Sequence, residues 1–321
     1  MSSRTDSMTR EKRPEGLHLG NADPTVSVLM PVHNAGRYLR TAIESILTQT
    51  FEDFELLALD DGSTDNSLSI LREFEALDGR MRVRSRENKG LVPTLNELIE
   101  GARGRYLARM DSDDICRPQR FEKQIAYLDT HPECVAVGSR VLYIDPEGMP
   151  IFEPTNELTH EEIDSGHMSG VMAMRICHPC VMMRRAAVMQ TGGYWEHHFA
   201  EDLDLFLRLA EIGRLANLSD VLFEYRQHLR SLSHSYPSQY RKFSKLAIDD
   251  ASKRRGRDID REKFESILKV ESRAEISRRW AWWALSAGNL ATARKHAIKA
   301  LVRQPFSIEN LVVVACAIRG H

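Results

Sequence analysis

The feature that most constrains the fold is a regular alternation of apolar and amphipathic runs over residues 26–110. Short apolar runs suit strands, and the stretches between them repeat apolar residues every three or four positions, as helices do. The expected strands are 26–30, 54–60, 81–85 and 105–110, and the expected helices are 36–50, 66–77 and 91–104. This alternation predicts an α/β fold with a mainly parallel central sheet and helices on both faces.

Polar clusters directly follow three of these four strands. They read PVHNAG after the first strand, DDGSTD after the second and DSDD after the fourth. Parallel α/β sheets bind ligands at the carboxyl ends of their strands, so the shared position of the clusters matters more than any one of them. We therefore expect a single ligand site at this edge of the sheet.

The DSDD cluster is a candidate cation site. Asp111 and Asp113 alternate across one residue, so in extended backbone their carboxylates point the same way. Oxygen ligands of this kind suit Mg²⁺ or Mn²⁺, ions that commonly bridge phosphates. Taken alone, such a cluster is more often a solvated turn that caps a helix. Its place beside two other polar clusters favours the cation site.

The other two clusters also have ordinary structural interpretations. Asp61, in DDGSTD, can accept a hydrogen bond from a base or a ribose hydroxyl, or simply belong to a turn between strand and helix. DDGSTD lacks the spacing of a calcium-binding EF-hand loop. His33, in PVHNAG, can stack on a base, although a lone histidine is more often structural.

Length and composition exclude several classes of protein. The 321 residues allow one large domain, or one domain with an appendage, around a sizeable core. A net charge of −2 gives no electrostatic reason to expect a nucleic-acid partner. The sequence has neither a run of roughly 18 apolar residues nor a secretory signal, so the expected location is the cytoplasm.

Three regions are expected along the chain. Residues 1–24 are polar and without periodicity, which predicts a flexible tail, and residues 25–237 carry the α/β pattern. Residues 238–321 are expected to form a helical extension, in which residues 283–305 have the spacing of one tetratricopeptide-like hairpin that turns at Gly288. One such hairpin cannot bury its own apolar face, so it should pack on the catalytic domain or on a partner protein.

The ordered set of motifs over residues 25–235 resembles the family 2 glycosyltransferases, which have the GT-A fold. The matching segments include VSVLMPVHNAG, LALDDGSTDNS, ENKG, GRYLARMDSDDICRP, HPCVMMRR, TGGY, EDLDLFLRL and YRQH. The resemblance implies a metal-dependent, inverting enzyme that uses Mn²⁺ or Mg²⁺ and a nucleoside-diphosphate sugar. A UDP-sugar is the default donor, with guanosine and thymidine nucleotides as alternatives. The acceptor implied is a glycan or a lipid-linked intermediate of surface-polysaccharide biosynthesis.

The resemblance also assigns roles to residues. Those expected to bind the nucleotide sugar are Pro31, Val32, His33, Asn34, Asp61, Asn88, Lys89 and Asp111. The metal is expected on Asp113 and His228, with Asp114 behind Asp113. Asp202 is expected to be the general base, and the like charge of Glu201 beside it should raise one pKa of the pair. His178, Gly193 and Tyr194 are expected on the acceptor side.

Two other functions fit part of the pattern. A catalytically silent protein of the same fold could bind or regulate without transferring sugar, but such a binder would need no base at Asp202. A nucleotidyltransferase of similar fold would carry a glycine-rich loop with a basic residue at the first strand, where this chain has PVHNAG. The motifs of P-loop and Rossmann dinucleotide proteins do not occur in the sequence.

Two further motifs have weaker functional interpretations. The CHPC motif at 177–180 is one C-x-x-C without a second pair, so zinc is not expected there. The RRWAWW motif at 278–283 should pack mainly in the core of the helical extension. Its sharper alternative is peripheral contact with the inner face of the membrane, which would suit a lipid-linked acceptor.

Overall fold

The computed structural model describes residues 23–169, 174–195, 199–228, 237–257 and 271–321. The expected flexible tail therefore lies outside the described residues, apart from its last two positions. Within the described part of the chain, no helix has both the length and the apolar character needed to cross a membrane.

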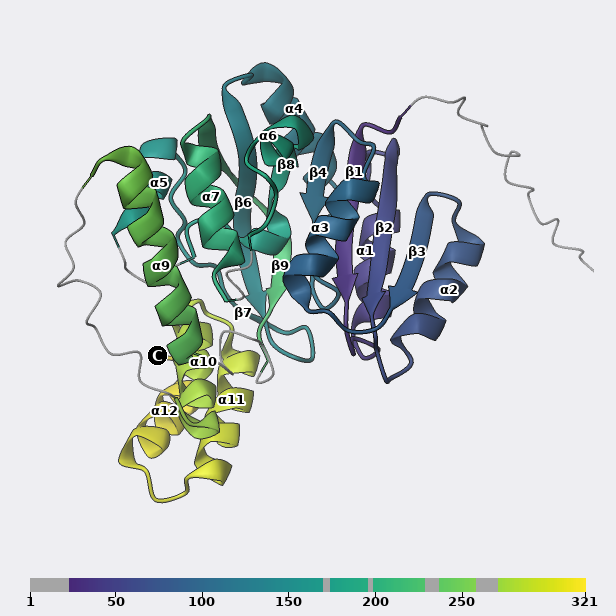
Figure 1. Cartoon of the computed structure of the whole chain (residues 1–321). Coiled ribbons are helices and arrows are strands. Elements are labelled where there is room, and N and C mark those ends of the chain that lie inside the picture. Colours follow the sequence, from purple (N-terminus) through teal and green to yellow (C-terminus); the bar gives the residue numbers. More distant parts are fainter. Residues whose placement is uncertain (1–22, 170–173, 196–198, 229–236, 258–270) are drawn as a thin grey trace, which may run out of the picture.

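A nine-stranded sheet forms the centre of the molecule (Figure 1). Its strands lie in the order β3-β2-β1-β4-β8-β6-β9-β5, with β7 paired to β6 outside this path. The strands are β1 Val26–Val32, β2 Phe54–Asp61, β3 Met81–Arg86, β4 Tyr106–Arg109, β5 Ile115–Cys116, β6 Cys134–Ile144, β7 Pro150–Phe152, β8 Met182–Arg184 and β9 Arg214–Arg226.

The sheet is mainly parallel, as the sequence predicts. β1 to β4 pair in parallel with their neighbours, and β6 and β9 run in the same direction. β8 lies antiparallel between β4 and β6, and β5 and β7 pair antiparallel with β9 and β6. The carboxyl ends of β1, β2 and β4 consequently meet at one edge, which is where the polar clusters follow them.

Helices cover both faces of the sheet. They are α1 Leu39–Leu47, α2 Ser67–Leu77, α3 Leu91–Gly101, α4 Arg120–Thr130, α5 His160–Met168, α6 Arg185–Gln190, α7 Glu201–Ala210 and α9 Pro237–Arg255, with a short 3₁₀ helix, η1, at His178–Cys180. Successive side chains of β1 face opposite sides, so Val28 joins the core under α1, α2 and α4, and Leu29 joins the core under α3, α6 and α7. The sequence analysis did not predict α5.

The C-terminal part is a separate bundle of three helices, α10 Arg273–Ser286, α11 Leu290–Arg303 and α12 Ile308–Arg319. The turn between α10 and α11 lies at Gly288, whose φ of +77° is easily reached only without a side chain. The bundle packs against β7 through Ile151, which is fully buried. α9 packs on α7 instead.

The tryptophans of the RRWAWW motif are mostly core residues, as the sequence analysis expected. Trp280 is 2% exposed inside the bundle, and Trp283 packs against Phe152 of β7 with ring centroids 4.6 Å apart. Only Trp282 reaches the surface, with 38% of its area exposed. This motif therefore holds the bundle to the sheet.

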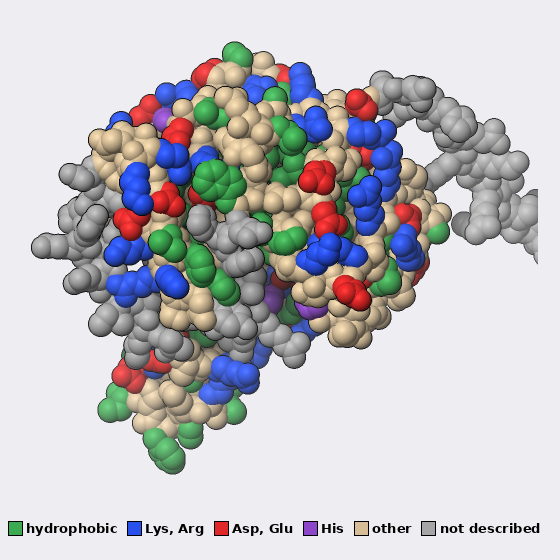
Figure 2. All heavy atoms as spheres, viewed as in Figure 1, with side chains coloured by type: hydrophobic (Ala, Val, Ile, Leu, Met, Phe, Trp, Pro, Cys, Tyr) green, Lys and Arg blue, Asp and Glu red, His purple; other side chains and the backbone are tan. Residues whose placement is uncertain are grey.

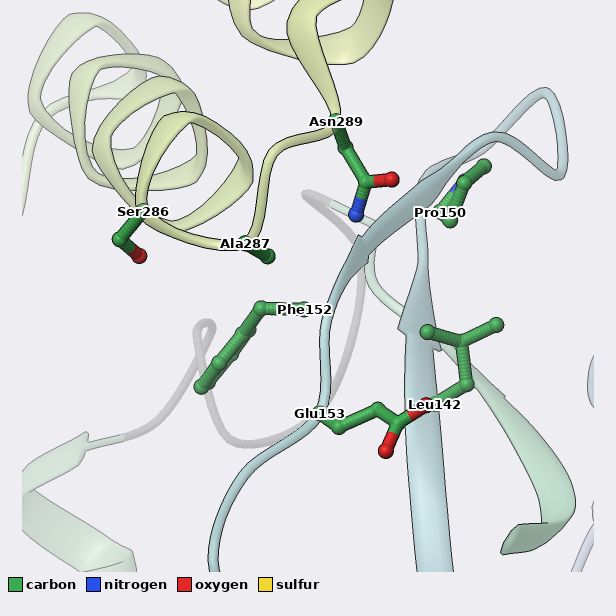
Figure 3. A pocket seen from close by; sticks show the side chains of 7 residues that line it. All are labelled: Leu142, Pro150, Phe152, Glu153, Ser286, Ala287 and Asn289. Carbon is green, nitrogen blue, oxygen red and sulfur yellow. The ribbon is translucent and has the colours of Figure 1, made fainter. Parts of the chain in front are cut away.

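A pocket of about 480 Å³ lies at the junction between the bundle and the sheet (Figure 3). Phe152 and Glu153 line it from the β7 side, and Ser286 and Asn289 line it from the α10–α11 turn. The Asn289 side chain holds the α10–α11 turn against β7, because its Nδ2 donates to the Ile151 carbonyl at 3.0 Å. None of the residues expected to bind the donor or the metal lines this pocket.

Candidate active site

The loops after β1, β2 and β3 are joined by hydrogen bonds at the sheet edge. His33 follows β1, and its Nδ1 lies 2.9 Å from the carbonyl oxygen of Asp61 at the end of β2. Asn88, after β3, donates through Nδ2 to the same carbonyl at 3.0 Å. Three residues from separate expected motifs thus lie in direct contact, as parallel strand ends require.

Asn34 holds the first loop in its shape. Its φ of +51° places it in the left-handed region, which asparagine tolerates better than most residues. Its side-chain Oδ1 accepts from the Thr64 backbone amide at 2.8 Å. The backbone amide of Asn34 donates to Ser63 Oγ at 2.9 Å. The residues at the end of β1, Pro31 and Val32, are buried beneath this loop.

Asp61 is only 4% exposed, and both of its carboxylate oxygens are engaged. Oδ1 accepts from the Lys89 amide at 2.8 Å, and Oδ2 accepts from the Gly90 amide at 2.9 Å. The Arg86 guanidinium also donates to Oδ1. The carboxylate therefore fixes the loop that carries Asn88 and Lys89. The sequence analysis missed Arg86, which is the last of three arginines in β3 and carries no distinguishing signal in the sequence.

The DSDD turn brings three carboxylates together. Oxygens of Asp111, Asp113 and Asp114 all lie within 4.8 Å of one another. Asp114 is 1% exposed, and no described residue donates to its Oδ2. Burial, and then the charges of Asp113 and Asp111, raise the pKa of Asp114 well above its usual value. An all-oxygen set with an unpartnered buried carboxylate oxygen fits a divalent cation, which would relieve this repulsion.

His228 and Arg226, at the end of β9, contact the same turn. His228 Nε2 lies 2.7 Å from Asp113 Oδ2, and its ring stacks on Tyr38 with centroids 6.0 Å apart. The Arg226 amide donates to Asp114 Oδ1 at 2.7 Å, and Arg226 Nε donates to the Asp113 carbonyl at 2.7 Å. Arg226 stands in the YRQH motif, but sequence reasoning gave it no role.

Arg226 also connects the acidic turn to the C-terminal bundle. Its guanidinium donates to the carbonyl of Asp145, just after β6, at 3.2 Å. The Asp145 side chain is fully buried, and its Oδ2 accepts from Lys295 Nζ at 2.5 Å and His296 Nε2 at 2.9 Å. Burial alone would raise the pKa of Asp145, but the hydrogen bonds from His296 and Lys295 lower it. Helix α11 is thus linked to the cation site through two residues.

Arg109, at the end of β4, lies between the acidic turn and α7. Its side chain is 1% exposed, and its Nη2 donates to Asp111 Oδ1 at 2.7 Å. The negative charges of Asp111 and Glu201 raise the pKa of this guanidinium against the effect of burial. Within the described residues, Arg109 Nε and Nη1 have no hydrogen-bond partner. The sequence analysis quoted this residue but did not predict a role for it.

Glu201 and Asp202 begin α7, and acidic residues are favourable at this end of a helix. Asp202 Oδ1 accepts from the Leu203 amide at 2.7 Å. Burial, and then the charge of Asp202, raise the pKa of Glu201 to about 8, and burial raises the pKa of Asp202. The pKa of Glu201 is thus raised in the direction that the sequence analysis expected for two neighbouring carboxylates, although burial contributes more than the like charge of Asp202.

The residues expected on the acceptor side form a buried contact. His178 Nε2 lies 2.6 Å from the Tyr194 hydroxyl, and burial lowers the pKa of His178 well below its usual value. Asn96 of α3 holds the Tyr194 backbone by accepting from its amide at 2.9 Å and donating to its carbonyl at 2.8 Å. A Cβ on Gly193 would lie 2.8 Å from Asn96 Oδ1, so this close approach requires glycine. The cysteines that flank His178 are buried core residues.

Comparison with known proteins identifies the family. The family model for "Glycosyl transferase family 2" matches residues 27–192, more than half of the chain. The chain belongs to this family. It is 36% identical over 215 residues to the putative glycosyltransferase EpsE of Bacillus subtilis, covering 64% of this chain and 74% of EpsE. It is 32% identical to the O-antigen biosynthesis glycosyltransferase WbnJ of Escherichia coli, covering 67% of this chain and 84% of WbnJ.

Solved structures share the GT-A fold of this glycosyltransferase. TarS 1–349 of S. aureus in complex with UDP-GlcNAc superposes with a TM-score of 0.58 at 19% identity, covering 92% of each chain. The mannosyltransferase PcManGT of Pyrobaculum calidifontis, in complex with GDP-Man and Mn²⁺, gives 0.56 at 18% identity and covers 93% of this chain and 81% of that one. The chain is accordingly an enzyme of glycosyl transfer, and the comparisons lend no support to a silent binding protein.

Proposed function

We propose that this glycosyltransferase moves a sugar from a nucleoside-diphosphate sugar to an acceptor hydroxyl with inversion at the anomeric carbon. The observation that carries the proposal is the position of Arg109. This buried cation bonds Asp111 of the acidic turn, and the ionised form of Glu201 would raise its pKa, so the acidic turn and the start of α7 both lie near one guanidinium. Transfer from a nucleoside-diphosphate sugar needs a site for the diphosphate next to a general base, and the acidic turn and the start of α7 could supply these two sites.

The donor is proposed to lie across the loops at the ends of β1, β2 and β3. The residues proposed to form this donor site, by direct contact or by support, are Pro31, Val32, His33, Asn34, Asp61, Asn88, Lys89 and Asp111. Because both Asp61 oxygens already accept protein hydrogen bonds, we propose that Asp61 acts by holding the Lys89 loop in place. A UDP-sugar is the proposed donor, because the TarS structure of the same fold is a complex with UDP-GlcNAc.

Asp113 and His228 are proposed to hold a divalent cation, with Asp114 supporting them. The buried Asp114 Oδ2, which has no hydrogen-bond partner among the described residues, supports the proposal of a cation here. Mn²⁺ is the first candidate, because the PcManGT complex contains it, and Mg²⁺ is the alternative. When bound, such an ion would neutralise charge on the diphosphate leaving group.

Asp202 is proposed to take the proton of the acceptor hydroxyl. The acceptor oxygen forms a bond to the anomeric carbon, the bond from that carbon to the diphosphate oxygen breaks, and the nucleoside diphosphate leaves. Glu201 is the group whose pKa is raised to about 8, so it stays protonated while Asp202 accepts the proton. His178, Gly193 and Tyr194 are proposed to shape the acceptor side.

The biological setting is proposed from the names of the relatives. WbnJ is an O-antigen biosynthesis enzyme, so a glycan or lipid-linked acceptor of surface-polysaccharide synthesis is the proposed substrate class. We propose residues 25–237 as the transferase domain and residues 238–321 as its helical extension. The enzyme is proposed to work in the cytoplasm, at the inner face of the membrane.

A thermal-shift panel tests donor and metal binding. We expect the melting temperature to rise with UDP or a UDP-sugar only when Mn²⁺ or Mg²⁺ is present, because a ligand of the native state stabilises it by mass action. Guanosine and thymidine diphosphates are the matched alternatives. If none of these nucleotides shifts the melting temperature at millimolar concentration, the proposed donor site is wrong.

Two substitutions separate binding from chemistry. Asp202→Asn should keep the metal-dependent shift with donor but lower transfer by about 10²-fold or more, because the base is lost. Asp113→Ala should lose the metal-dependent shift itself, and Asp129→Ala, at an exposed ion pair on α4, is the control that should change neither. Normal transfer by Asp202→Asn would show that the base lies elsewhere.

A further inference from the structure

Large apolar side chains are exposed along α11 and α12 and at the turn between them, which forms the free end of the C-terminal bundle. Phe306, between α11 and α12, is 96% exposed, and Val302 and Ile308 beside it are 76% and 75% exposed. Ile298 and Val302 lie four residues apart, on one face of α11. Figure 2 shows hydrophobic side chains at this end of the lobe. We call Ile298, Val302, Phe306, Ile308, Leu311 and Ile318 the apolar tip.

Helix α12 extends the apolar tip along α11. Leu311 and Ile318 of α12 are 50% and 66% exposed. The two helices lie side by side, because Arg294 of α11 donates to the carbonyls of Ala317 and Ile318. Exposed apolar groups gathered in this way mark a contact surface, whereas single ones need no explanation.

Helices α11 and α12 also carry an excess of cations. Residues 290–319 contain five Lys and Arg but one Asp or Glu, whereas the whole chain has a net charge of −2. Arg294, Arg303 and Arg319 are exposed, and within the described residues none of them pairs with a carboxylate. Exposed aromatic and aliphatic side chains with cations on the same two helices are the combination that anionic lipid headgroups and the acyl chains beneath them attract.

The bundle projects from the same side of the sheet as the cation site. In Figure 1, β1, β2 and β3 point toward the end of the molecule from which α10, α11 and α12 extend. The contacts of Lys295 and His296 with Asp145 fix α11 relative to the acidic turn. A surface that holds the apolar tip would therefore lie on the active-site side of the enzyme.

We propose that the apolar tip and the exposed arginines of α11 and α12 dock this glycosyltransferase on an anionic lipid surface. A protein partner would also cover apolar groups, but the excess of cations on the same two helices favours the lipid. The proposal moves the expected membrane contact from the RRWAWW motif, whose Trp280 is buried, to α11 and α12. Lipid docking rests on the proposed function in one respect: docking would give the enzyme access to the proposed lipid-linked acceptor.

Vesicle co-sedimentation of the full chain tests this docking. We expect binding to vesicles of phosphatidylcholine mixed with phosphatidylglycerol, weaker binding at high salt, and little binding to phosphatidylcholine alone. Phe306→Asp should weaken binding about tenfold or more, because it removes an exposed aromatic side chain that the bilayer would otherwise bury. Arg294→Glu combined with Arg303→Glu should weaken binding only to the anionic vesicles.

Leu77→Asp is the matched control. Leu77 ends α2 and is 74% exposed, so this change removes an equally exposed apolar side chain far from the bundle and should leave vesicle binding intact. Absence of binding to anionic vesicles would overturn the proposal. So would a dimer, seen by light scattering, that Phe306→Asp dissociates while vesicles stay unbound. Donor hydrolysis measured without vesicles reports separately on the catalytic proposal.

Discussion

Single residues at the sheet edge divide into those proposed to contact ligands and those that hold these residues in position. Arg109 and Arg226 are buried or nearly buried cations, and both bond to the acidic turn rather than to solvent. A buried cation next to a carboxylate costs desolvation free energy, so its presence here indicates that the charge of the turn must be positioned. These two arginines are as much part of the site as Asp111 and Asp113.

The pH dependence of the enzyme should report on Glu201. Because its pKa is raised to about 8, Glu201 is neutral below that pH and negatively charged above it. Glu201→Gln keeps the neutral form, so we expect kcat at neutral pH to stay within about threefold of the wild type. Above pH 8 the wild type gains a negative charge near the donor and its KM for donor should rise, whereas Glu201→Gln should lack this rise.

Steady-state kinetics of the wild type and Glu201→Gln, from neutral pH to above pH 8, give kcat and the KM for donor. Glu201→Asp, which retains a titrating carboxylate, is the matched control and should still show a rise in KM. A collapse of kcat at neutral pH in Glu201→Gln would instead identify Glu201 as the base.

At the scale of elements, the link between α11 and β9 joins the helical extension to the chemistry. His296 is 1% exposed and shares the Asp145 carboxylate with Lys295, and the Asp145 carbonyl accepts from Arg226. Partners behind metal ligands commonly tune metal affinity by tenfold or more. The helical extension is therefore more than an appendage.

His296→Ala tests this link. It leaves the buried Asp145 with one donor fewer, which should loosen Arg226 and weaken Mn²⁺ binding by about tenfold. Isothermal titration with Mn²⁺ gives the affinity, and a thermal melt gives the stability. Arg294→Ala, on the exposed face of the same helix, is the control and should leave the affinity unchanged. Lower stability with unchanged Mn²⁺ affinity in His296→Ala would mean that the link is only structural.

At the scale of the molecule, two apolar cores lie on opposite faces of the sheet and a third joins the C-terminal bundle to its edge. The third core contains Ile151 of β7 and Trp280 of α10, both almost fully buried. Because this contact is apolar and includes the ion pairs of Asp145, we expect the bundle and the sheet to unfold together.

A truncated chain that ends before Arg273, and so lacks the bundle, tests whether the bundle and the sheet unfold cooperatively. Removal of the bundle exposes Ile151 and deprives Asp145 of its cations, so the melting temperature should fall by about 5 °C or more. Calorimetry should show one transition in the full chain. Two separate transitions in the full chain, or an unchanged melting temperature in the shortened one, would contradict a single cooperative unit.

The sequence by itself determined the order of the elements before residue 110 and the edge of the sheet at which the polar clusters gather. The short apolar run of β1 and the period of three to four in the helices are local properties, so the elements before residue 110 could be predicted from neighbouring residues. The acidic turn was predictable for the same reason, because Asp111, Asp113 and Asp114 are consecutive in the chain and follow a strand. The family resemblance then supplied the roles.

Only the tertiary structure decided which distant residues meet. Arg226 contacts Asp113 and His296 contacts Asp145, and each pair is separated by more than a hundred residues in the sequence. No local periodicity can therefore predict either contact. The exposure of Phe306 likewise depends on where α12 folds back, while the equally apolar Trp280 ends up inside. Burial and charge pairing are properties of the packed chain, and they separate supporting residues from surface ones where composition alone cannot.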